Sequence, residues 1–122
     1  MMLPLLLTLL LTPLLALADI TGFYASSQME VAAAIELEAD GKFDYSLDYG
    51  AVSEFAEGTW SSEGGTIYLT STKMQGAYEA PAFVREPLKF DGNSLLLRRY
   101  DTTIRFNRDD SLPTPPDRKK KL

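Results

Sequence analysis

The sequence predicts an all-β protein that folds as a small antiparallel up-and-down barrel of about eight strands. Short runs of alternating apolar and polar residues are separated by turn signals such as Asp40-Gly41, Gly64-Gly65 and Asp91-Gly92-Asn93. Helical periodicity is nearly absent after residue 18, and no crossover helix separates the runs, so neighbouring strands should pair antiparallel. Eight runs over the 92 residues from 19 to 110 give one strand every 11 or 12 residues, the spacing of a small barrel or sandwich.

The alternating runs define the expected strands. Each run is short, and most are bounded by Gly, Asp, Asn or Ser. They are Ile20–Ala25, Met29–Glu38, Lys42–Tyr49, Ser53–Ser61, Thr66–Thr70, Phe83–Phe90, Leu95–Tyr100 and Thr102–Arg108.

Residues 1–18, MMLPLLLTLLLTPLLALA, are typical of a secretory signal peptide. An apolar run ends in Ala16-Leu17-Ala18, a small-x-small cleavage site, although no Lys or Arg precedes the run. The alternatives are a membrane anchor and a wrongly assigned start codon, but the apolar run is shorter than the roughly 20 residues that span a bilayer. We therefore expect cleavage after Ala18, a periplasmic or secreted location, and no stable membrane insertion after cleavage.

The rest of the chain divides into one barrel domain, residues 19–110, and a tail, residues 111–122. The domain has room for one hydrophobic core. The tail, SLPTPPDRKKKL, holds three prolines and little apolar surface, so we expect it to be disordered. Its basic run, Arg118–Lys121, is interpreted as a solubilising terminus, with contact to anionic lipid headgroups as the alternative.

Composition excludes several kinds of chemistry. The chain has no Cys and no His, which removes disulfides, a lipidated Cys, His/Cys zinc sites, Ser-His-Asp triads and Cys nucleophiles. We expect no enzyme, no metal and no cofactor. Between Asp19 and Glu63 ten acidic residues stand against one basic residue, which argues against a nucleic-acid partner.

The second and third expected strands predict their own register. A three-residue loop, Ala39-Asp40-Gly41, places Leu37 opposite Phe43 and keeps the apolar residues of both strands on one face. By the same register Ile35 lies opposite Tyr45 and Ala33 opposite Leu47. The loop requires a positive φ at Gly41.

The next hairpin predicts a two-residue Gly64-Gly65 turn. That turn places Trp60 opposite Leu69 and Ser62 opposite Ile67. Trp60 is the only tryptophan, and we expect it to anchor the core. Gly58, two residues earlier on the same face, either leaves room beside the indole or marks a bend.

Two later segments have weaker patterns. Pro87 cannot donate to a strand ladder, so we expect it on an edge or at a bulge. The longest connection, residues 72–82, is a candidate lid over the barrel mouth, with an ordinary surface loop as the alternative.

The stretch Ile35–Ser71 resembles a pattern of small bacterial envelope barrels. The pattern runs apolar residue, Asp-Gly-x-Phe, Gly-x-Trp, Gly turn and apolar strand. It is met here by Leu37, Asp40-Gly41-Lys42-Phe43, Gly58-Thr59-Trp60, Gly64-Gly65 and Ile67-Tyr68-Leu69. The chain thus resembles lipocalin-like domains of unassigned function and the barrel of an envelope copper-stress lipoprotein. That lipoprotein family carries a lipidated Cys and a Cys pair, which this chain lacks, so the resemblance implies a fold and no metal or anchoring role.

Acidic residues offer two candidate arrangements. The predicted register places Glu36 opposite Asp44 on the outer face with Glu38 and Asp48 nearby, either as a solvated strip or as ligands for a cation such as Ca²⁺. Glu54 and Glu57 form a possible carboxylate pair of the glycosidase type, although nothing in the sequence places them in a cleft.

The leading functional hypothesis is a lipocalin-like module that binds a small apolar ligand without catalysis. Small inward residues would leave space in the barrel, and inward tyrosines would supply hydroxyl groups. The candidate ligand-binding residues are Tyr45, Tyr49, Trp60, Ala33 and Gly58. The alternative is a protein-interaction module, such as an inhibitor or an envelope assembly or stress factor, whose acidic outer face attracts a basic partner. An internal void would favour the first hypothesis; a filled interior with an exposed aromatic side chain would favour the second.

Overall fold

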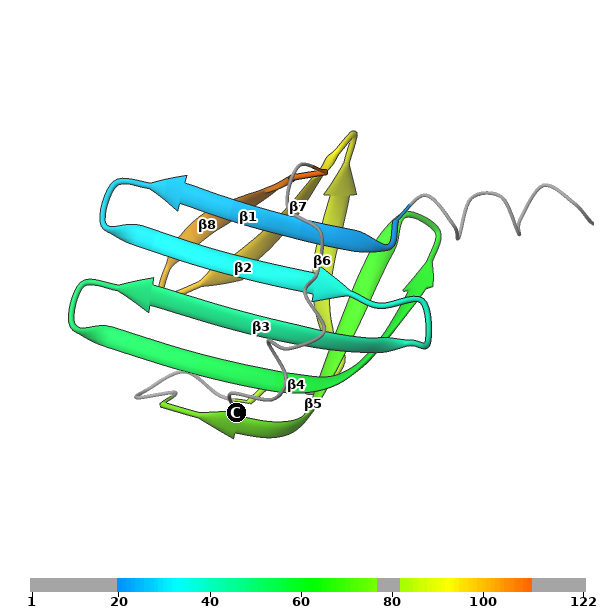
Figure 1. The fold of residues 1–122 in the computed structure, drawn as a ribbon, viewed down its shortest axis with the longest axis horizontal. Coiled ribbons are helices and arrows are strands. Elements are labelled where there is room, and N and C mark those ends of the chain that lie inside the picture. Colours follow the sequence, from blue (N-terminus) through cyan, green and yellow to red (C-terminus); the bar gives the residue numbers. More distant parts are fainter. Residues whose placement is uncertain (1–19, 77–81, 111–122) are drawn as a thin grey trace, which may run out of the picture.

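The computed structural model describes residues 20–76 and 82–110, which form one closed antiparallel barrel (Figure 1). Each strand pairs with its neighbours in sequence, and the last strand pairs with the first, Tyr24 lying opposite Arg108. This confirms the predicted eight-stranded up-and-down barrel. The strands are β1 (Gly22–Gln28), β2 (Val31–Leu37), β3 (Lys42–Tyr49), β4 (Val52–Glu63), β5 (Thr66–Gln75), β6 (Glu86–Asp91), β7 (Ser94–Arg99) and β8 (Thr102–Arg108).

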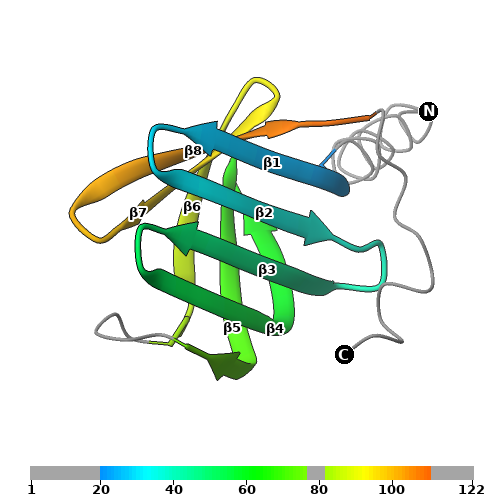
Figure 2. The ribbon, with the colours of Figure 1, turned by 60° about the vertical axis from the view of Figure 1, so that its left-hand side comes forward.

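Hairpin turns alternate between the two ends of the barrel (Figure 2). The turns β1–β2, β3–β4 and β7–β8 lie at one end, which we call the Tyr100 end. The turns β2–β3, β4–β5 and β6–β7 lie at the other, which we call the Asp40 end. Among the described residues there is no helix long and apolar enough to cross a membrane. The predicted signal peptide and basic tail lie outside the described residues.

The predicted β2–β3 register is confirmed. Leu37 lies opposite Phe43, and Ile35 lies opposite Tyr45. The loop residue Gly41 has a φ of 88°, and its N–H donates to the Glu38 carbonyl at 3.0 Å. An L-residue is strained in this conformation, which explains the glycine.

The β4–β5 hairpin is also as predicted at its turn. Gly64 and Gly65 both have positive φ, and Trp60 lies opposite Leu69. Further from the turn the register shifts between Glu57 and Gly58, which confirms the bend expected at Gly58. A Cβ at Gly58 would lie 2.1 Å from the Thr70 carbonyl oxygen, so the close approach of β4 to β5 requires glycine there.

The bounds of β5 and β6 differ from the prediction. β5 continues to Gln75. Thr72–Gln75 is therefore strand, and the prediction of a lid over these residues is wrong. Residues 77–81 of the expected lid lie outside the described residues. β6 begins at Glu86, three residues later than predicted. Pro87 pairs with Tyr68 of β5, whereas pairing with β7 starts only at Lys89, so this proline lies where β6 has one ladder partner.

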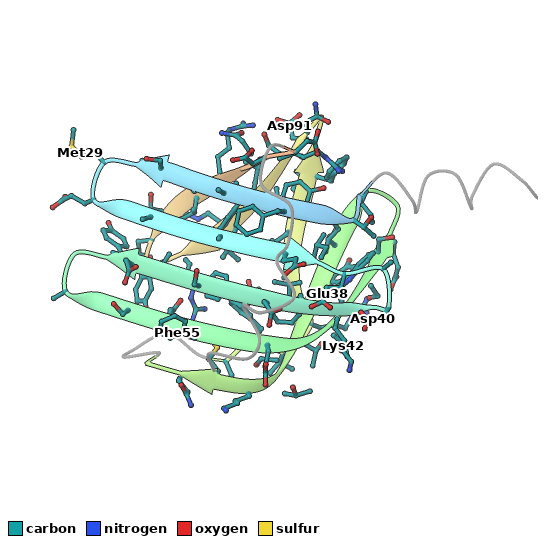
Figure 3. The ribbon with its side chains drawn as sticks, in the orientation of Figure 1. Met29, Glu38, Asp40, Lys42, Phe55 and Asp91 are labelled. Carbon is teal, nitrogen blue, oxygen red and sulfur yellow. The ribbon has the colours of Figure 1, made fainter. Side chains whose placement is uncertain are left out.

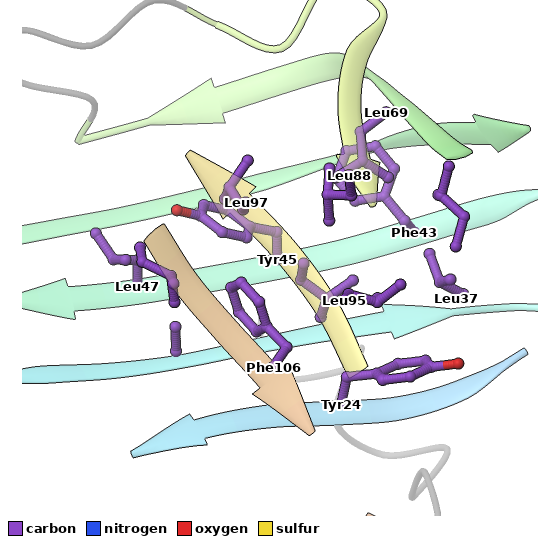
Figure 4. Packing of buried hydrophobic residues seen from close by; sticks show 14 of the residues in the cluster. Tyr24, Leu37, Phe43, Tyr45, Leu47, Leu69, Leu88, Leu95, Leu97 and Phe106 are labelled. Atoms are coloured by element: carbon purple, nitrogen blue, oxygen red, sulfur yellow. The ribbon is translucent and has the colours of Figure 1, made fainter. Parts of the chain in front are cut away.

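Inward side chains from all eight strands fill the barrel (Figure 4). Their alternation follows the predicted parity, for example in β3, where Phe43, Tyr45 and Leu47 are buried. The ring of Tyr45 lies 4.9 Å from that of Phe83 and 6.5 Å from that of Phe106 on β8, so aromatic rings cross the interior from one wall to another. The interior that these residues describe is therefore a packed core.

At the Asp40 end, β1 and β8 are joined by Tyr24 and Arg108. The Arg108 Nη2 donates to the Tyr24 hydroxyl at 2.8 Å, and the guanidinium lies 5.1 Å from the Tyr24 ring centroid. The Tyr24 hydroxyl donates in turn to the Ile20 carbonyl at 2.7 Å. These contacts close the barrel where the β1–β8 ladder is short.

Candidate functional site

The most unusual group in the barrel is a buried ionic network around Glu54. Alternation in β4 turns Glu54 inward together with Ala56, and its side chain is fully buried. Arg99 reaches it from β7, donating from Nε to Oε1 and from Nη2 to Oε2 at 3.1 Å. The hydroxyls of Tyr45 and Tyr100 donate to Oε1 and Oε2 at 2.7 and 2.8 Å. Every carboxylate oxygen therefore has partners, as a buried charge requires.

This environment perturbs the ionisation of its members. Burial opposes the charged form of Glu54, but the hydrogen bonds from Arg99, Tyr45 and Tyr100 outweigh burial and lower its pKa. Burial and the donated hydrogen bond to Glu54 raise the pKa of Tyr45 far above its ordinary value. Glu54 and Arg99 are thus a fixed ion pair, and Tyr45 stays neutral.

Tyr100 enters the network from a strained turn. Tyr100 and Asp101 join β7 to β8 with φ of 54° and 58°, a conformation that non-glycine residues rarely adopt. The Tyr100 ring lies 6.0 Å from that of Tyr49, edge to face, and its hydroxyl bonds to Glu54. These contacts offset the cost of the backbone conformation.

The five predicted ligand-binding residues do not form one pocket. Tyr45 and Tyr49 lie toward the Tyr100 end, where Tyr45 is buried and Tyr49 is half-buried. Trp60 lies at the Asp40 end, where it is half-buried and packs against the core, and its indole N–H donates to the Glu38 carbonyl at 2.8 Å. Ala33 is buried opposite Leu47, and Gly58 abuts the backbone of β5.

The Glu54–Glu57 pair does not exist as a pair. Glu54 faces the interior, whereas Glu57 is exposed on the outer face, opposite Lys73 of β5. Successive side chains of a strand point to opposite faces of the sheet. Glu54 and Glu57 are an odd number of positions apart on β4, so their side chains point to opposite faces. The two carboxylates therefore cannot act on one glycosidic bond.

The outer face of β2–β5 carries a second candidate site, which we call the acidic hollow. Its lining combines acidic side chains, two lysines and aromatic rings. The residues that define it are Phe23, Glu36, Glu38, Lys42, Asp44, Phe55, Glu57, Thr59, Thr72 and Lys73. Four acids against two lysines leave it negatively charged, and Phe55 is 53% exposed within it. Figure 3 shows Phe55 on β4 and Glu38 beside the β2–β3 turn on the same wall of the barrel.

The predicted pairing of Glu36 with Asp44 is confirmed, and Glu38 joins them. The two residues are direct partners in the β2–β3 ladder. One ligand oxygen from each of Glu36, Glu38 and Asp44 can be chosen so that all lie within 4.8 Å of one another. Asp48, which was also expected nearby, is not part of this group; its carboxylate accepts a hydrogen bond from the Ser53 hydroxyl.

The network around Glu54 was missed in the sequence. A signal for it exists: Glu54 falls at an inward position of its strand, and so does Arg99, two residues after the inward Leu97. Opposite charges at inward positions of different strands indicate a buried ion pair, because an isolated charge is not tolerated there.

No match to this chain is found among protein-family models, curated proteins or solved structures. The barrel is compatible with a lipocalin-like binding module, and its site must be argued from its own residues.

Proposed function

We propose that the chain is a non-catalytic interaction module that docks a basic segment of a partner protein onto the acidic hollow of β2–β5. The observation that carries the proposal is Phe55, a large apolar side chain that is 53% exposed amid four acidic residues. An exposed aromatic ring in a hollow of net negative charge is typical of a contact surface, where the ring supplies buried area and the charges attract the partner.

The packed interior supports the same choice. Tyr45, Phe83 and Phe106 occupy the centre of the barrel, and the Glu54 network occupies its Tyr100 end. A lipocalin-type ligand would have to displace these side chains. A partner on the outer face would displace none of them.

Charge distribution adds a second reason. The chain from Asp19 to Glu63 holds ten acidic residues and one basic residue, and it includes all of β1–β4. An excess of negative charge on these strands accelerates association with a basic partner, and added salt weakens the effect. A periplasmic or secreted location remains part of the proposal, because the expected leader would place this surface outside the cytoplasm.

Site-specific photocrosslinking in the host tests the docking proposal. A photoreactive amino acid at position 55 is expected to give a discrete protein adduct, which mass spectrometry of the tryptic peptides identifies. The matched control is the same amino acid at Thr103, an exposed position on β8 outside the acidic hollow. Equal labelling from both positions, or no adduct from position 55, contradicts the proposal.

A small apolar ligand is the second candidate, favoured by one feature of the Tyr100 end. Four partly buried hydrophobic side chains pack against the core there: Tyr49, Val52, Met74 and Tyr100. They would contact a ligand that enters between the hairpins, with the Tyr45 hydroxyl and Arg99 below it. A bound small molecule in protein recovered from its host would favour this candidate.

A further inference from the structure

A row of ladder partners crosses the four strands β1–β4 within the acidic hollow. Phe23 of β1 lies opposite Glu36 of β2. Asp44 of β3 lies opposite Glu36 on one side and opposite Glu57 of β4 on the other. All four residues line the hollow. The row therefore begins at Phe23 on β1 and leads directly across the sheet to β4.

The chain leaves the barrel at the first residue of this row. Asp109, directly after β8, donates its N–H to the Phe23 carbonyl at 2.9 Å. The backbone that precedes residues 111–122 is thus hydrogen-bonded to a residue of the hollow itself. Every later residue of the chain is tethered to that point.

Residues 111–122 carry the charge that complements the hollow. Their sequence, SLPTPPDRKKKL, holds four basic residues at positions 118–121 and one acidic residue, Asp117. The hollow holds four acidic residues and two lysines. Opposite net charges on two parts of one chain attract each other, and the attraction is strongest at low salt.

The tether is long enough to bring the two parts together. Position 118 is eight residues beyond Asp110, so it can lie at most about 26–29 Å away. Three strand spacings of about 4.7–4.9 Å separate β1 from β4, which makes the row about 14–15 Å long. The three prolines among residues 113–116 reduce the conformational freedom that docking removes. We propose that residues 118–121 dock on the acidic hollow of the same chain and compete there with the basic segment of a partner.

The competition rests on the proposed function, whereas the docking does not. A tethered segment is present at its site at a high effective concentration, so a free segment with the same charges would rarely displace it. A partner that also covers Phe55, which is 53% exposed, gains buried apolar area in addition to charge. The tail would therefore select for partners that contact this ring.

Paramagnetic relaxation enhancement in the full chain recovered from its host tests the docking. The chain has no cysteine, so Leu122→Cys provides a single attachment site for a nitroxide spin label next to the basic run. At low salt the label should broaden the amide signal of Glu57 and leave that of Thr103, on β8 outside the hollow, at its ordinary width. The broadening should be lost between about 0.01 M and 1 M salt, because the Debye length falls from about 30 Å to about 3 Å.

Two variants of the spin-labelled chain remove charge on either side of the contact. The neutral-tail variant, Arg118→Gln/Lys119→Gln/Lys120→Gln/Lys121→Gln, keeps the length of the tether and should lose the broadening at Glu57. Asp44→Asn should reduce it. The matched control is Asp48→Asn, which removes the same charge from the outer face of the same strand but outside the hollow, and it should leave the broadening unchanged.

Four results would overturn the docking. They are equal broadening at Glu57 and Thr103, broadening that persists in the neutral-tail variant, equal effects of Asp44→Asn and Asp48→Asn, and broadening that passes between molecules. The last is measured by mixing isotope-labelled chains that carry no spin label with spin-labelled chains that carry no isotope. Broadening in that mixture would place the tail of a second copy in the hollow.

Photocrosslinking from position 55 tests the competition separately. The yield of the partner adduct should rise in the neutral-tail variant, and an unchanged or lower yield would contradict competition. No adduct from either protein would contradict the proposed function instead. The relaxation measurement uses the protein alone, so it decides the docking in either case.

Discussion

Glu54 and Arg99 are 45 positions apart in the chain, yet they form a two-point ion pair inside the barrel. The pair joins β4 to β7, two strands that are not neighbours in the sheet. Tyr45 and Tyr100 complete the coordination of the carboxylate. The network therefore fixes the relative positions of opposite walls, in addition to the apolar packing around it.

Removing one charge of this pair should be strongly destabilising. Arg99→Met leaves Glu54 buried without its counter-ion, and we expect the free energy of unfolding to fall by about 3–5 kcal/mol. The double variant Glu54→Leu/Arg99→Met removes both charges and should recover much of that loss, because no buried charge is left unpaired. Urea denaturation of the single and double variants measures the difference. A double variant no more stable than Arg99→Met would contradict this account.

Stability should fall at acid pH because of Glu54. The network lowers its pKa in the folded state below that of the unfolded chain, so the unfolded state binds the proton first as pH falls. The contribution is complete above the ordinary glutamate pKa of about 4.3 and is lost as pH falls through the lower, folded-state value. Urea denaturation between about pH 7 and pH 2 should show the loss in the parent and a smaller one in Glu54→Leu/Arg99→Met. The same pH dependence of the free energy of unfolding in both proteins would show that Glu54 is not the source of the loss.

Gly58 should tolerate substitution less well than Gly41. At Gly58 an added Cβ would lie 2.1 Å from the Thr70 carbonyl oxygen, so the β4 and β5 backbones must separate. At Gly41 no atom lies within 4 Å of the added Cβ, and only the positive φ is unfavourable. Gly41→Ala should cost about 1 kcal/mol, and Gly58→Ala should exceed it by about 1–3 kcal/mol. Thermal denaturation of the two variants shows which substitution lowers stability more, and a greater loss in Gly41→Ala would contradict this prediction.

Trp60 should contribute less to stability than a fully buried tryptophan. Trp60→Phe removes the indole N–H bond to the Glu38 carbonyl, which still accepts from the Gly41 N–H, so the cost should be about 0.5–1.5 kcal/mol. Trp60→Ala should cost less than the about 3–5 kcal/mol typical of a fully buried ring, because one side of the ring is solvated. Chemical denaturation followed by circular dichroism measures the loss of stability in each variant. A loss in Trp60→Ala at or above the about 3–5 kcal/mol of a fully buried ring would contradict this expectation.

The β-hairpins were predictable because their register depends on local geometry. Parity and loop length alone fixed Leu37 opposite Phe43, and the paired glycines fixed the β4–β5 turn. The extension of β5 to Gln75 was not predictable, because Thr72–Gln75 has no clean alternation and becomes strand through pairing with β4 across a bulge.

The functional residues were less accessible from sequence for a physical reason. Parity assigns a residue to a face but not to a depth along the barrel, so Tyr45 and Trp60 share the inner face while lying toward opposite ends. The partner of Glu54 depends on which strands face each other across the barrel, which only closure decides. The Glu36–Asp44 pair was predictable because both members belong to one hairpin.

Native mass spectrometry of the protein recovered from its host tests the central claim, that this barrel binds a protein on its outer face. We expect a complex with a protein partner that is lost in a Phe55→Ala/Glu57→Lys variant, and a barrel that carries no small molecule once the partner dissociates. The denatured mass should correspond to a chain that begins at Asp19. A defined adduct of about a few hundred daltons, the size of a pocket-bound small ligand, with no protein partner would contradict the claim and place the function inside the barrel.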